Sequence, residues 1–344
     1  MRRRIEEATQ MTREERIAIV GTGYALGDEI RGNDDPIFDY LVAHPPPNRD
    51  LFEGLKYRRA LADGQSLVSI ATAAAQRALD DAGLTAQQIN MLLGAASVGE
   101  YDAPNALAAV HAELGLADSC RVMALNSEYT GFIDGLKLAH DLIETGTIAR
   151  ALVVAGIDWT RHMDYHEAVC VAASDAAGAA VVGRTSDATR FTLVDWDNQT
   201  STRLYGALRM APRPVAVPPT YADAQLFTTP LMKLDDKTGA EAVKTFGLPV
   251  PPLVVNRLLA KHGLSGKDVA LVAHQTSKLV QEYWIRNIRP ACYVSTLTDL
   301  ADMVSASVPV NLAKCYDEIT KDHLVLLGIG IEMRATALLY TRQT

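Results

Sequence analysis

The chain has 344 residues, 48% of them hydrophobic, which suits two ordinary domains or one large double domain. Its net charge of -8 argues against nucleic-acid binding, because phosphate recognition needs a basic footprint. The four cysteines show no CxxC spacing, so neither a zinc site nor a disulfide framework is indicated; they are Cys120, Cys170, Cys292 and Cys315.

The beginning of the chain is charged and has no apolar core, so it does not read as a secretory signal. No apolar run approaches the length of a membrane span. We therefore expect a cytoplasmic protein without membrane contact, in which residues 1–15 form a flexible tail.

The first half of the chain reads as alternating strands and helices. Residues 16–20 are predicted to form a strand, and Gly21-Thr22-Gly23 is predicted to form the turn that ends it. The GTGYALG spacing does not match a dinucleotide-binding fingerprint. Residues 31–52 are predicted to be loop, because Pro45-Pro46-Pro47 excludes regular structure. The further predicted elements are helices at 67–83, 103–114 and 132–146 and strands at 89–96, 122–125, 151–156 and 171–182.

The second half repeats the strand-helix-strand-helix-strand order. Its predicted strands lie at 191–195, 268–273, 323–327 and 335–340, and a predicted helix lies at 253–262. After its first strand comes a long segment that is expected to be irregular and to lie on the surface near a substrate entrance; it contains Pro212, Pro214, Pro218 and Pro219.

One strand-turn-helix unit resembles the nucleophile region of the thiolase superfamily, most closely 3-oxoacyl-carrier-protein synthase III. There the turn carries a nucleophilic cysteine followed by a small residue, Gly and Phe. Here Thr130-Gly131-Phe132 keeps the last three positions and Tyr129 takes the place of the cysteine. Residues 54–59 and 174–182 are also similar to segments of that family.

The resemblance covers residues 16–342 and implies the thiolase fold, an α/β architecture. Two similar halves, residues 16–188 and 189–344, would then stack as five layers in the order α-β-α-β-α. The resemblance also implies a homodimer.

Two further positions match catalytic positions of that family. His274-Gln275 follows a predicted buried strand, as does the family's catalytic histidine. Asp302 stands where the family has its catalytic asparagine, and Ser307-Val308-Pro309 fixes this register. The non-catalytic alternatives are that His274 is a structural residue hydrogen-bonded to the backbone, and that Asp302 is a loop carboxylate that caps a helix.

The tyrosine changes the expected chemistry. A phenol with a pKa of about 10 is a poor nucleophile at neutral pH, and neither Ser127 nor a cysteine is a convincing replacement. We therefore expect a His-Asp pair, His274 and Asp302, to act as general base on a hydroxyl acceptor, without an acyl-enzyme. Tyr129 would position the acyl group, with Ser127 and Glu128 beside it.

The family's glycine-rich turn, which supplies an oxyanion-hole amide, reads here Gly328-Ile329-Gly330-Ile331-Glu332. Ile331 keeps an amide but adds a bulky side chain, and Glu332 is either structural or a second carboxylate near the substrate. Both are candidate substrate-binding residues.

Basic side chains near the predicted site could dock an acidic carrier protein, although a solvated helix face is an equal alternative; they are Arg257, Lys261, Lys278 and Arg286. His162 and His166 lack a third ligand, so no metal site is expected. No cofactor is expected besides the phosphopantetheine or coenzyme A of the substrate.

The resemblance implies an acyltransferase that moves an acyl group from an acyl carrier protein or acyl-CoA to a hydroxyl acceptor. The chain looks like the branch that acylates sugars of aromatic antibiotics, including the aminocoumarin class. The alternatives are a non-catalytic partner in a heterodimer, a thioester hydrolase and a decarboxylative ketosynthase with another nucleophile.

Overall fold

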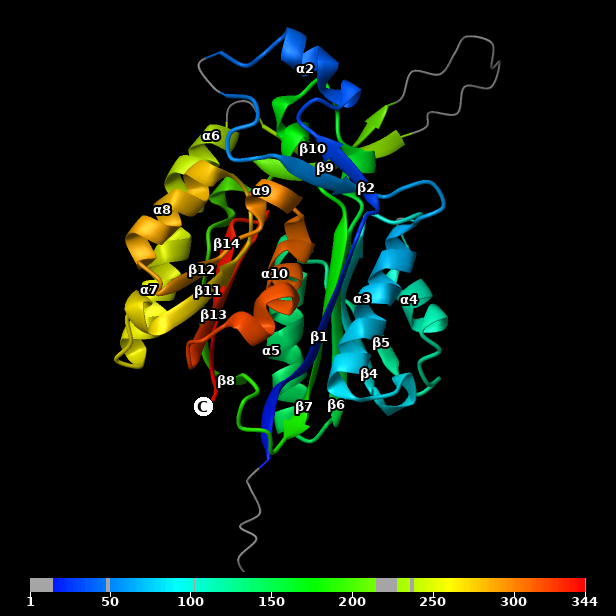
Figure 1. The fold of residues 1–344 in the computed structure, drawn as a ribbon, viewed down its shortest axis with the longest axis vertical. Helices are drawn as coiled ribbons and strands as arrows, with labels where there is room; N and C mark the ends of the chain where they lie inside the picture. The colour runs from blue at the N-terminus through cyan, green and yellow to red at the C-terminus, as the bar shows by residue number, and fades with distance from the viewer. Residues whose placement is uncertain (1–14, 48–49, 102, 215–227, 236–237, 344) are drawn as a thin grey trace, which may run out of the picture.

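The structure is a computed structural model that describes residues 15–47, 50–101, 103–214, 228–235 and 238–343. Through these residues runs a ten-stranded mixed sheet in the order β12-β11-β13-β14-β8-β1-β7-β6-β4-β5 (Figure 1). The strands are β1 (Arg16–Leu26), β4 (Met91–Ser97), β5 (Arg121–Ala124), β6 (Arg150–Ile157), β7 (Ala176–Thr185), β8 (Thr192–Thr200), β11 (Val269–Ala273), β12 (Cys292–Val294), β13 (His323–Gly330) and β14 (Arg334–Thr341).

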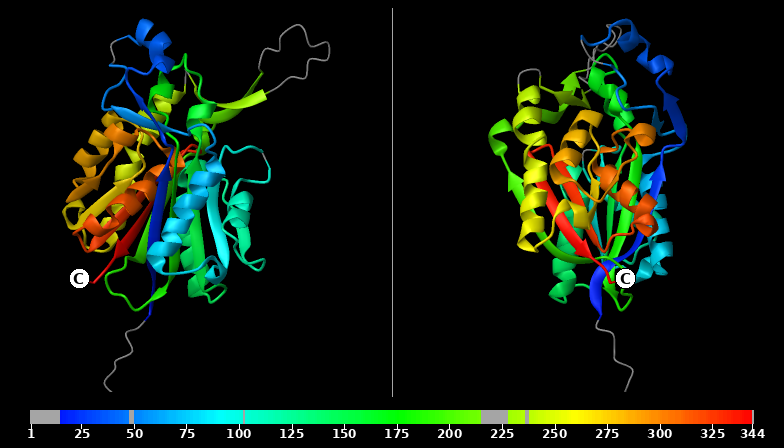
Figure 2. Two further views of the ribbon diagram at one scale, coloured as in Figure 1. Left: turned by 45° about the vertical axis from the view of Figure 1, so that its right-hand side comes forward. Right: turned by 60° about the vertical axis from the view of Figure 1, so that its left-hand side comes forward.

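The sheet consists of two halves of five strands that meet where β1 pairs with β8. Each half has helices on its outer face, and two helices lie between the halves (Figure 2). The helices α3 (Leu67–Ala82) and α4 (Leu107–Glu113) cover the first half, α7 (Val250–Lys261) and α8 (Lys278–Ile288) cover the second, and α5 (Gly131–Glu144) and α10 (Ser307–Cys315) lie between them. This confirms the predicted α-β-α-β-α order of layers.

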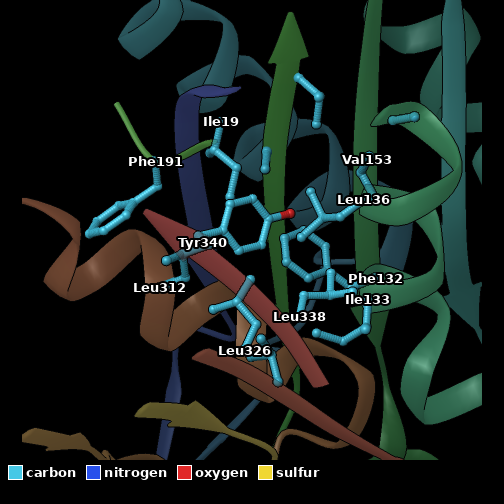
Figure 3. Packing of buried hydrophobic residues seen from close by; sticks show 14 of the residues in the cluster. Ile19, Phe132, Ile133, Leu136, Val153, Phe191, Leu312, Leu326, Leu338 and Tyr340 are labelled. Carbon is cyan, nitrogen blue, oxygen red and sulfur yellow. The ribbon is translucent and has the colours of Figure 1, made fainter. Parts of the chain in front are cut away.

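The central layer is held by a cluster of buried apolar side chains contributed by both halves. Figure 3 shows Phe132 and Leu136 of α5 facing Leu326 and Leu338 of the second half. Burial of large apolar side chains such as these supplies most of the free energy that holds the two halves together. The helices α5 and α10 are therefore fixed by packing on both of their sides.

A buried tyrosine hydroxyl adds a polar link across the same seam. Tyr316 Oη donates a hydrogen bond to the carbonyl oxygen of Ile19 on β1 and accepts one from the amide of Phe191, which precedes β8, each at 3.1 Å. The Tyr316 side chain is 5% exposed. A buried hydroxyl that uses both its donor and an acceptor position stabilises the seam at little desolvation cost.

The predicted turn at Gly21-Thr22-Gly23 is wrong, because β1 continues through it to Leu26 and pairs with β7 along its whole length. The glycines serve close packing instead. A Cβ at Gly21 would lie 2.3 Å from the carbonyl oxygen of Ala78, and one at Gly23 would lie 2.3 Å from that of Ala74. The glycines thus let α3 approach the strand at backbone distance.

The prediction of loop for residues 31–52 is only partly right. β2 (Glu29–Gly32) pairs antiparallel with β3 (Tyr57–Ala60), and the connection between them contains a 3-10 turn followed by the helix α2 (Asp39–Ala43). Asp35 caps that turn by accepting a hydrogen bond from the amide of Ile37 at 3.0 Å. The three consecutive prolines come after α2 and leave it intact.

The segment that was predicted to be irregular contains an antiparallel hairpin, β9 (Leu208–Pro214) with β10 (Thr228–Leu234). Pro212 and Pro214 lie in β9, where a two-stranded ribbon leaves amide positions outside the ladder and so tolerates proline. Pro218 and Pro219 lie outside the described residues. The hairpin lies at the end of the molecule where α2 also lies (Figure 1).

The remaining helices are short, α6 (Gly239–Ala242) and α9 (Leu297–Leu300). In the part of the chain that the structure describes, no helix has both the length and the apolar character needed to span a membrane.

Candidate active site

Three candidate residues come together at one end of the central layer. Tyr129 lies in the 3-10 turn between β5 and α5, His274 follows β11 directly, and Asp302 precedes the 3-10 turn that leads into α10. The exposed fractions are 6% for Tyr129, 2% for His274 and 9% for Asp302. The first residue comes from one half of the molecule and the other two from the second half, so the site exists only where the halves are packed together.

The backbone around His274 fixes the state of its imidazole. Nδ1 lies 3.1 Å from the carbonyl oxygen of Val304, which can only accept a hydrogen bond, so Nδ1 carries the proton. Nε2 then bears the free lone pair and lies 3.9 Å from Oδ1 of Asp302. Burial lowers the pKa of His274 to about 4, so the ring is neutral at physiological pH. A neutral imidazole with Nε2 unprotonated is the form that can accept a proton.

Asp302 lies on the Nε2 side of the imidazole, too far for a hydrogen bond. Its Oδ1 accepts a hydrogen bond from the amide of Val304 at 2.8 Å. Burial raises the pKa of Asp302 to about 8. At neutral pH the side chain is therefore mainly a carboxylic acid, which can donate a hydrogen bond.

This geometry corrects the predicted division of roles. Asp302 was expected to orient His274 as a carboxylate, but the carbonyl of Val304 orients the ring through Nδ1. A protonated Asp302 instead presents a donor on the reactive side of the imidazole.

The ring of Tyr129 lies between two other rings. It stacks on the imidazole of His274 with centroids 5.4 Å apart and planes inclined by 21°, and it meets Trp159 edge-on at 5.8 Å. Its hydroxyl lies 3.8 Å from Sδ of Met232 on β10. The tyrosine therefore shields one face of His274 and joins the hairpin to the site.

The residues beside Tyr129 are placed differently. Ser127 precedes the turn, its carbonyl oxygen accepts from the amide of Thr130 at 3.0 Å, and its buried Oγ has no hydrogen-bond partner among the described residues. The side chain of Glu128 lies outside the described part of the structure. Ser127 thus remains a candidate substrate contact.

The turn between β13 and β14 separates the two other predicted contacts. Ile331 packs against the apolar cluster that contains Tyr129. Glu332 points to Arg334, whose Nη2 lies 2.9 Å from Oε1, and Arg334 also contacts Asp134 at 2.5 Å and Thr130. Burial raises the pKa of Glu332. Glu332 therefore belongs to a polar cluster at the start of α5. This cluster includes Thr130, the residue that follows Tyr129.

The four basic candidates for carrier docking lie on the neighbouring helices α7 and α8, and three of them lie beside carboxylates. Arg257 binds Asp197 through two hydrogen bonds of 2.5 and 2.9 Å, and Lys261 lies 3.8 Å from the same carboxylate. Lys278 begins α8, four residues after His274, and lies 3.9 Å from Glu53. Arg286 is exposed further along α8. Lys278 is thus the candidate nearest to the site along the chain.

The two histidines that were weighed as metal ligands each face a carboxylate. His162 Nε2 lies 3.8 Å from Asp158, and His166 Nδ1 lies 3.1 Å from Asp164. Among the described residues, no group of three or more His, Cys, Asp or Glu side chains could hold a metal ion.

The sequence reasoning did not identify Val304, Trp159 or Met232 as part of the site. Val304 acts through its backbone, which no side-chain pattern reveals. Met232 lies about a hundred positions from Tyr129 in a segment without periodicity, so its contact depends on the tertiary fold. Trp159 comes three residues after the predicted strand at 151–156, and this position just beyond a buried strand was its only signal.

Comparison with known sequences supports the resemblance. Residues 123–206 match the family model for 3-oxoacyl-[acyl-carrier-protein (ACP)] synthase III. The β-ketoacyl-[acyl-carrier-protein] synthase III of Laribacter hongkongensis is 27% identical over 325 residues, which cover 91% of this chain and 95% of that protein. The corresponding synthase of Cereibacter sphaeroides is 32% identical, but the match covers 50% of this chain and 53% of that protein.

Solved structures share the fold. The priming β-ketosynthase of the R1128 polyketide pathway superimposes with a TM-score of 0.80 at 20% identity, covering 96% of this chain and 98% of that one. The synthase III of Pseudomonas aeruginosa gives a TM-score of 0.78 at 23% identity, covering 96% and 99%. The thiolase-like fold is therefore confirmed, and the chain is similar in sequence to synthase III enzymes.

Proposed function

We propose that this protein is an acyltransferase of the synthase III type that moves an acyl group from a thioester directly to a hydroxyl. The observation that carries the proposal is the placement of Nε2 of His274 3.9 Å from the carboxyl group of Asp302, with Nδ1 bound to the carbonyl of Val304 and the ring of Tyr129 stacked on the imidazole. The donor would be an acyl carrier protein or acyl-CoA, in keeping with the printed names of the relatives.

The transfer would proceed as a general-base reaction. Nε2 of His274 accepts the proton of the acceptor hydroxyl as its oxygen attacks the thioester carbonyl. Protonated Asp302 donates a hydrogen bond to the carbonyl oxygen, which gains negative charge in the tetrahedral intermediate. When the carbon–sulfur bond breaks, the leaving thiolate takes the proton from Nε2, which restores the neutral imidazole.

The resemblance to acyltransferases of antibiotic biosynthesis suggests a sugar hydroxyl of a natural product as the acceptor. A homodimer is the assembly that the resemblance suggests.

The reaction can be tested with purified protein, butyryl-CoA or benzoyl-CoA as donor and a methyl glycoside as acceptor, with the ester measured by mass spectrometry. His274→Ala should lower ester formation at least about 100-fold, because general-base catalysis contributes on that scale. His262→Ala is the matched control, since His262 is bound to Asp195 at 2.9 Å on the surface.

Three results would contradict the proposal in different ways. Release of the free acid without ester would indicate a hydrolase. A mass increase of the protein by one acyl group would show a covalent intermediate. Ester formation undiminished by His274→Ala would remove the imidazole from the reaction.

A further inference from the structure

The chain around Asp302 adopts an unusual backbone conformation. Ala301 has a φ of 52° and Val304 a φ of 47°, both in the left-handed region that side chains with a Cβ disfavour. Such conformations persist only where the surrounding structure holds them, and they are common at functional sites. The residues that hold this segment therefore control where the carboxyl group of Asp302 lies.

One anchor of the segment is backbone pairing. The amide of Asp302 donates to the carbonyl of Ala172 at 2.8 Å, and the carbonyl of Asp302 accepts from the amide of Ser174 at 3.1 Å. This pairing fixes the main chain on one side. It does not reach the residues before Asp302, which turn back toward the end of β11.

The second anchor is the side chain of Gln275, which is fully buried and follows His274. Its Nε2 donates a hydrogen bond to the carbonyl oxygen of Ala301 at 3.0 Å. Its Oε1 accepts from the amide of Thr296 at 2.6 Å and from Nδ2 of Asn311 at 3.0 Å. One amide group thus binds both ends of the 296–301 segment and ties them to the strand that carries the imidazole.

We propose that Gln275 is a positioning residue that holds Asp302 against His274 by fixing Ala301 in its left-handed conformation. The expected loss of catalysis in a Gln275 variant rests on the proposed function, while the expected displacement of Asp302 does not. If the side chain at 275 loses its donor, Ala301 is free to leave the disfavoured conformation. Asp302 then moves away from Nε2 and toward solvent.

The chain offers a matched control in Gln281. This glutamine is also buried, at 6% exposed, and its Oε1 accepts from Oγ of Ser295 at 3.0 Å. Gln275 lies 3.3 Å from the same hydroxyl. The two glutamines therefore share a neighbour, and the hydrogen bond to Ala301 belongs to Gln275.

The experiment compares Gln275→Met with Gln281→Met, since methionine keeps the volume and removes the hydrogen bonds. For Gln275→Met we expect kcat to fall by about 10-fold or more with KM changed by less than about threefold, because orientation of the reacting groups is lost. Gln281→Met should keep both values. A structural role alone would affect both variants in the same way.

A second readout needs no substrate. Carbon-13 labelling of the aspartates, with the Asp302 signal assigned by its loss in Asp302→Asn, gives the titration of this carboxyl directly. Gln275→Met should lower its midpoint by at least about one pH unit, since the carboxyl gains solvent. Gln281→Met should leave it unchanged.

Ala301→Gly provides a further check, because glycine adopts a positive φ without penalty and depends less on Gln275. In the Ala301→Gly background, the effect of Gln275→Met on kcat and on the titration should shrink by at least about threefold.

The proposal is overturned if Gln275→Met keeps the wild-type kcat and titration, if Gln281→Met changes as much, or if the effect persists undiminished beside Ala301→Gly. Should Gln275→Met not fold, a wild-type Asp302 that titrates near its ordinary value of about 4 also overturns it. If the wild type transfers no acyl group but the titration moves only in Gln275→Met, the proposed function fails and the positioning role stands.

Discussion

The phenol ring of Tyr129 lies stacked on the imidazole of His274, with centroids 5.4 Å and planes 21° apart. The proposed function requires no nucleophilic cysteine at this position. Here an aromatic ring covers one face of the imidazole and leaves the Nε2 edge beside Asp302. The site thus holds an imidazole and a phenol, and residue 129 carries no thiol.

If Tyr129 stands where related enzymes carry a nucleophilic cysteine, as the sequence resemblance implies, a thiol at this position should form an acyl-enzyme. We expect Tyr129→Cys to gain the mass of one acyl group on incubation with butyryl-CoA, because a thiol next to an unprotonated imidazole can be deprotonated. Intact-protein mass spectrometry measures the adduct. The wild type, which already contains four cysteines, is the control for adventitious labelling.

Tyr129→Phe separates the ring from the hydroxyl. The stacking on His274 and the edge contact with Trp159 involve the ring alone. We expect Tyr129→Phe to keep ester formation within about fivefold of wild type, because the proposed reaction assigns no proton transfer to the phenol hydroxyl. A loss above about 100-fold would mean that the hydroxyl takes part in the reaction.

The buried pair gives a defined dependence of stability on pH. The pKa of Asp302, raised to about 8, means that the folded state keeps a proton which the unfolded state releases above about 4, so stability falls as pH rises from about 4 to 8. The pKa of His274, lowered to about 4, acts oppositely, because the unfolded state binds an extra proton below about 6.5. The two slopes oppose each other below about 6.5, and only that of Asp302 remains above it.

We therefore expect Asp302→Asn to stabilise the protein increasingly between pH 6.5 and 8, by up to about 1 kcal/mol per pH unit. Urea denaturation at half-unit steps of pH measures the change in the free energy of unfolding. Asp63→Asn, on the surface, should leave the pH dependence as it is. A constant difference between Asp302→Asn and wild type across this range would mean that Asp302 is ionised in the folded state.

The polar link across the seam can be tested by Tyr316→Phe, which removes the hydroxyl and keeps the ring. The carbonyl of Ile19 and the amide of Phe191 then lose a buried partner, so unfolding should become easier by about 1–3 kcal/mol. Tyr205→Phe, at 86% exposed, is the control and should change the free energy of unfolding by less than about 0.5 kcal/mol. Equal effects of the two changes would show that the link does not contribute.

Gly23→Ala tests the close approach of β1 and α3. The added methyl would lie 2.3 Å from the carbonyl oxygen of Ala74, so strand and helix must separate at a cost of about 3 kcal/mol. Gly183→Ala is the matched control, because a Cβ there meets its nearest neighbour at 3.5 Å, an ordinary contact. Thermal unfolding of both variants compares them, and a Gly23→Ala as stable as Gly183→Ala would refute the packing argument.

Local sequence patterns were enough to predict the strands that lead to the site, but not the role of the glycines in β1. The apolar runs before Tyr129 and His274 correctly predicted strands. The resemblance of three motifs to the synthase III family predicted that Tyr129, His274 and Asp302 share one site, and the structure places them together. The pattern at Gly21 and Gly23 suggested a turn, because glycine marks both turns and close packing. Only the position of α3 decides between the two.

The roles of the site residues were less predictable than their identities. Asp302 was expected to be a carboxylate, since an aspartate is normally ionised at neutral pH. Its burial reverses this, and burial at one residue follows from the whole fold. The orienting partner of His274 is a backbone carbonyl, which every residue possesses and which therefore leaves no trace in the sequence.

The location of the site at the seam has a consequence for how the protein loses activity. Tyr129 belongs to one half of the molecule, and His274 with Asp302 belongs to the other. A slight parting of the halves would separate the phenol from the imidazole while each five-stranded unit stayed intact. Under the proposed function, mild denaturant should thus lower ester formation before circular dichroism registers any loss of secondary structure.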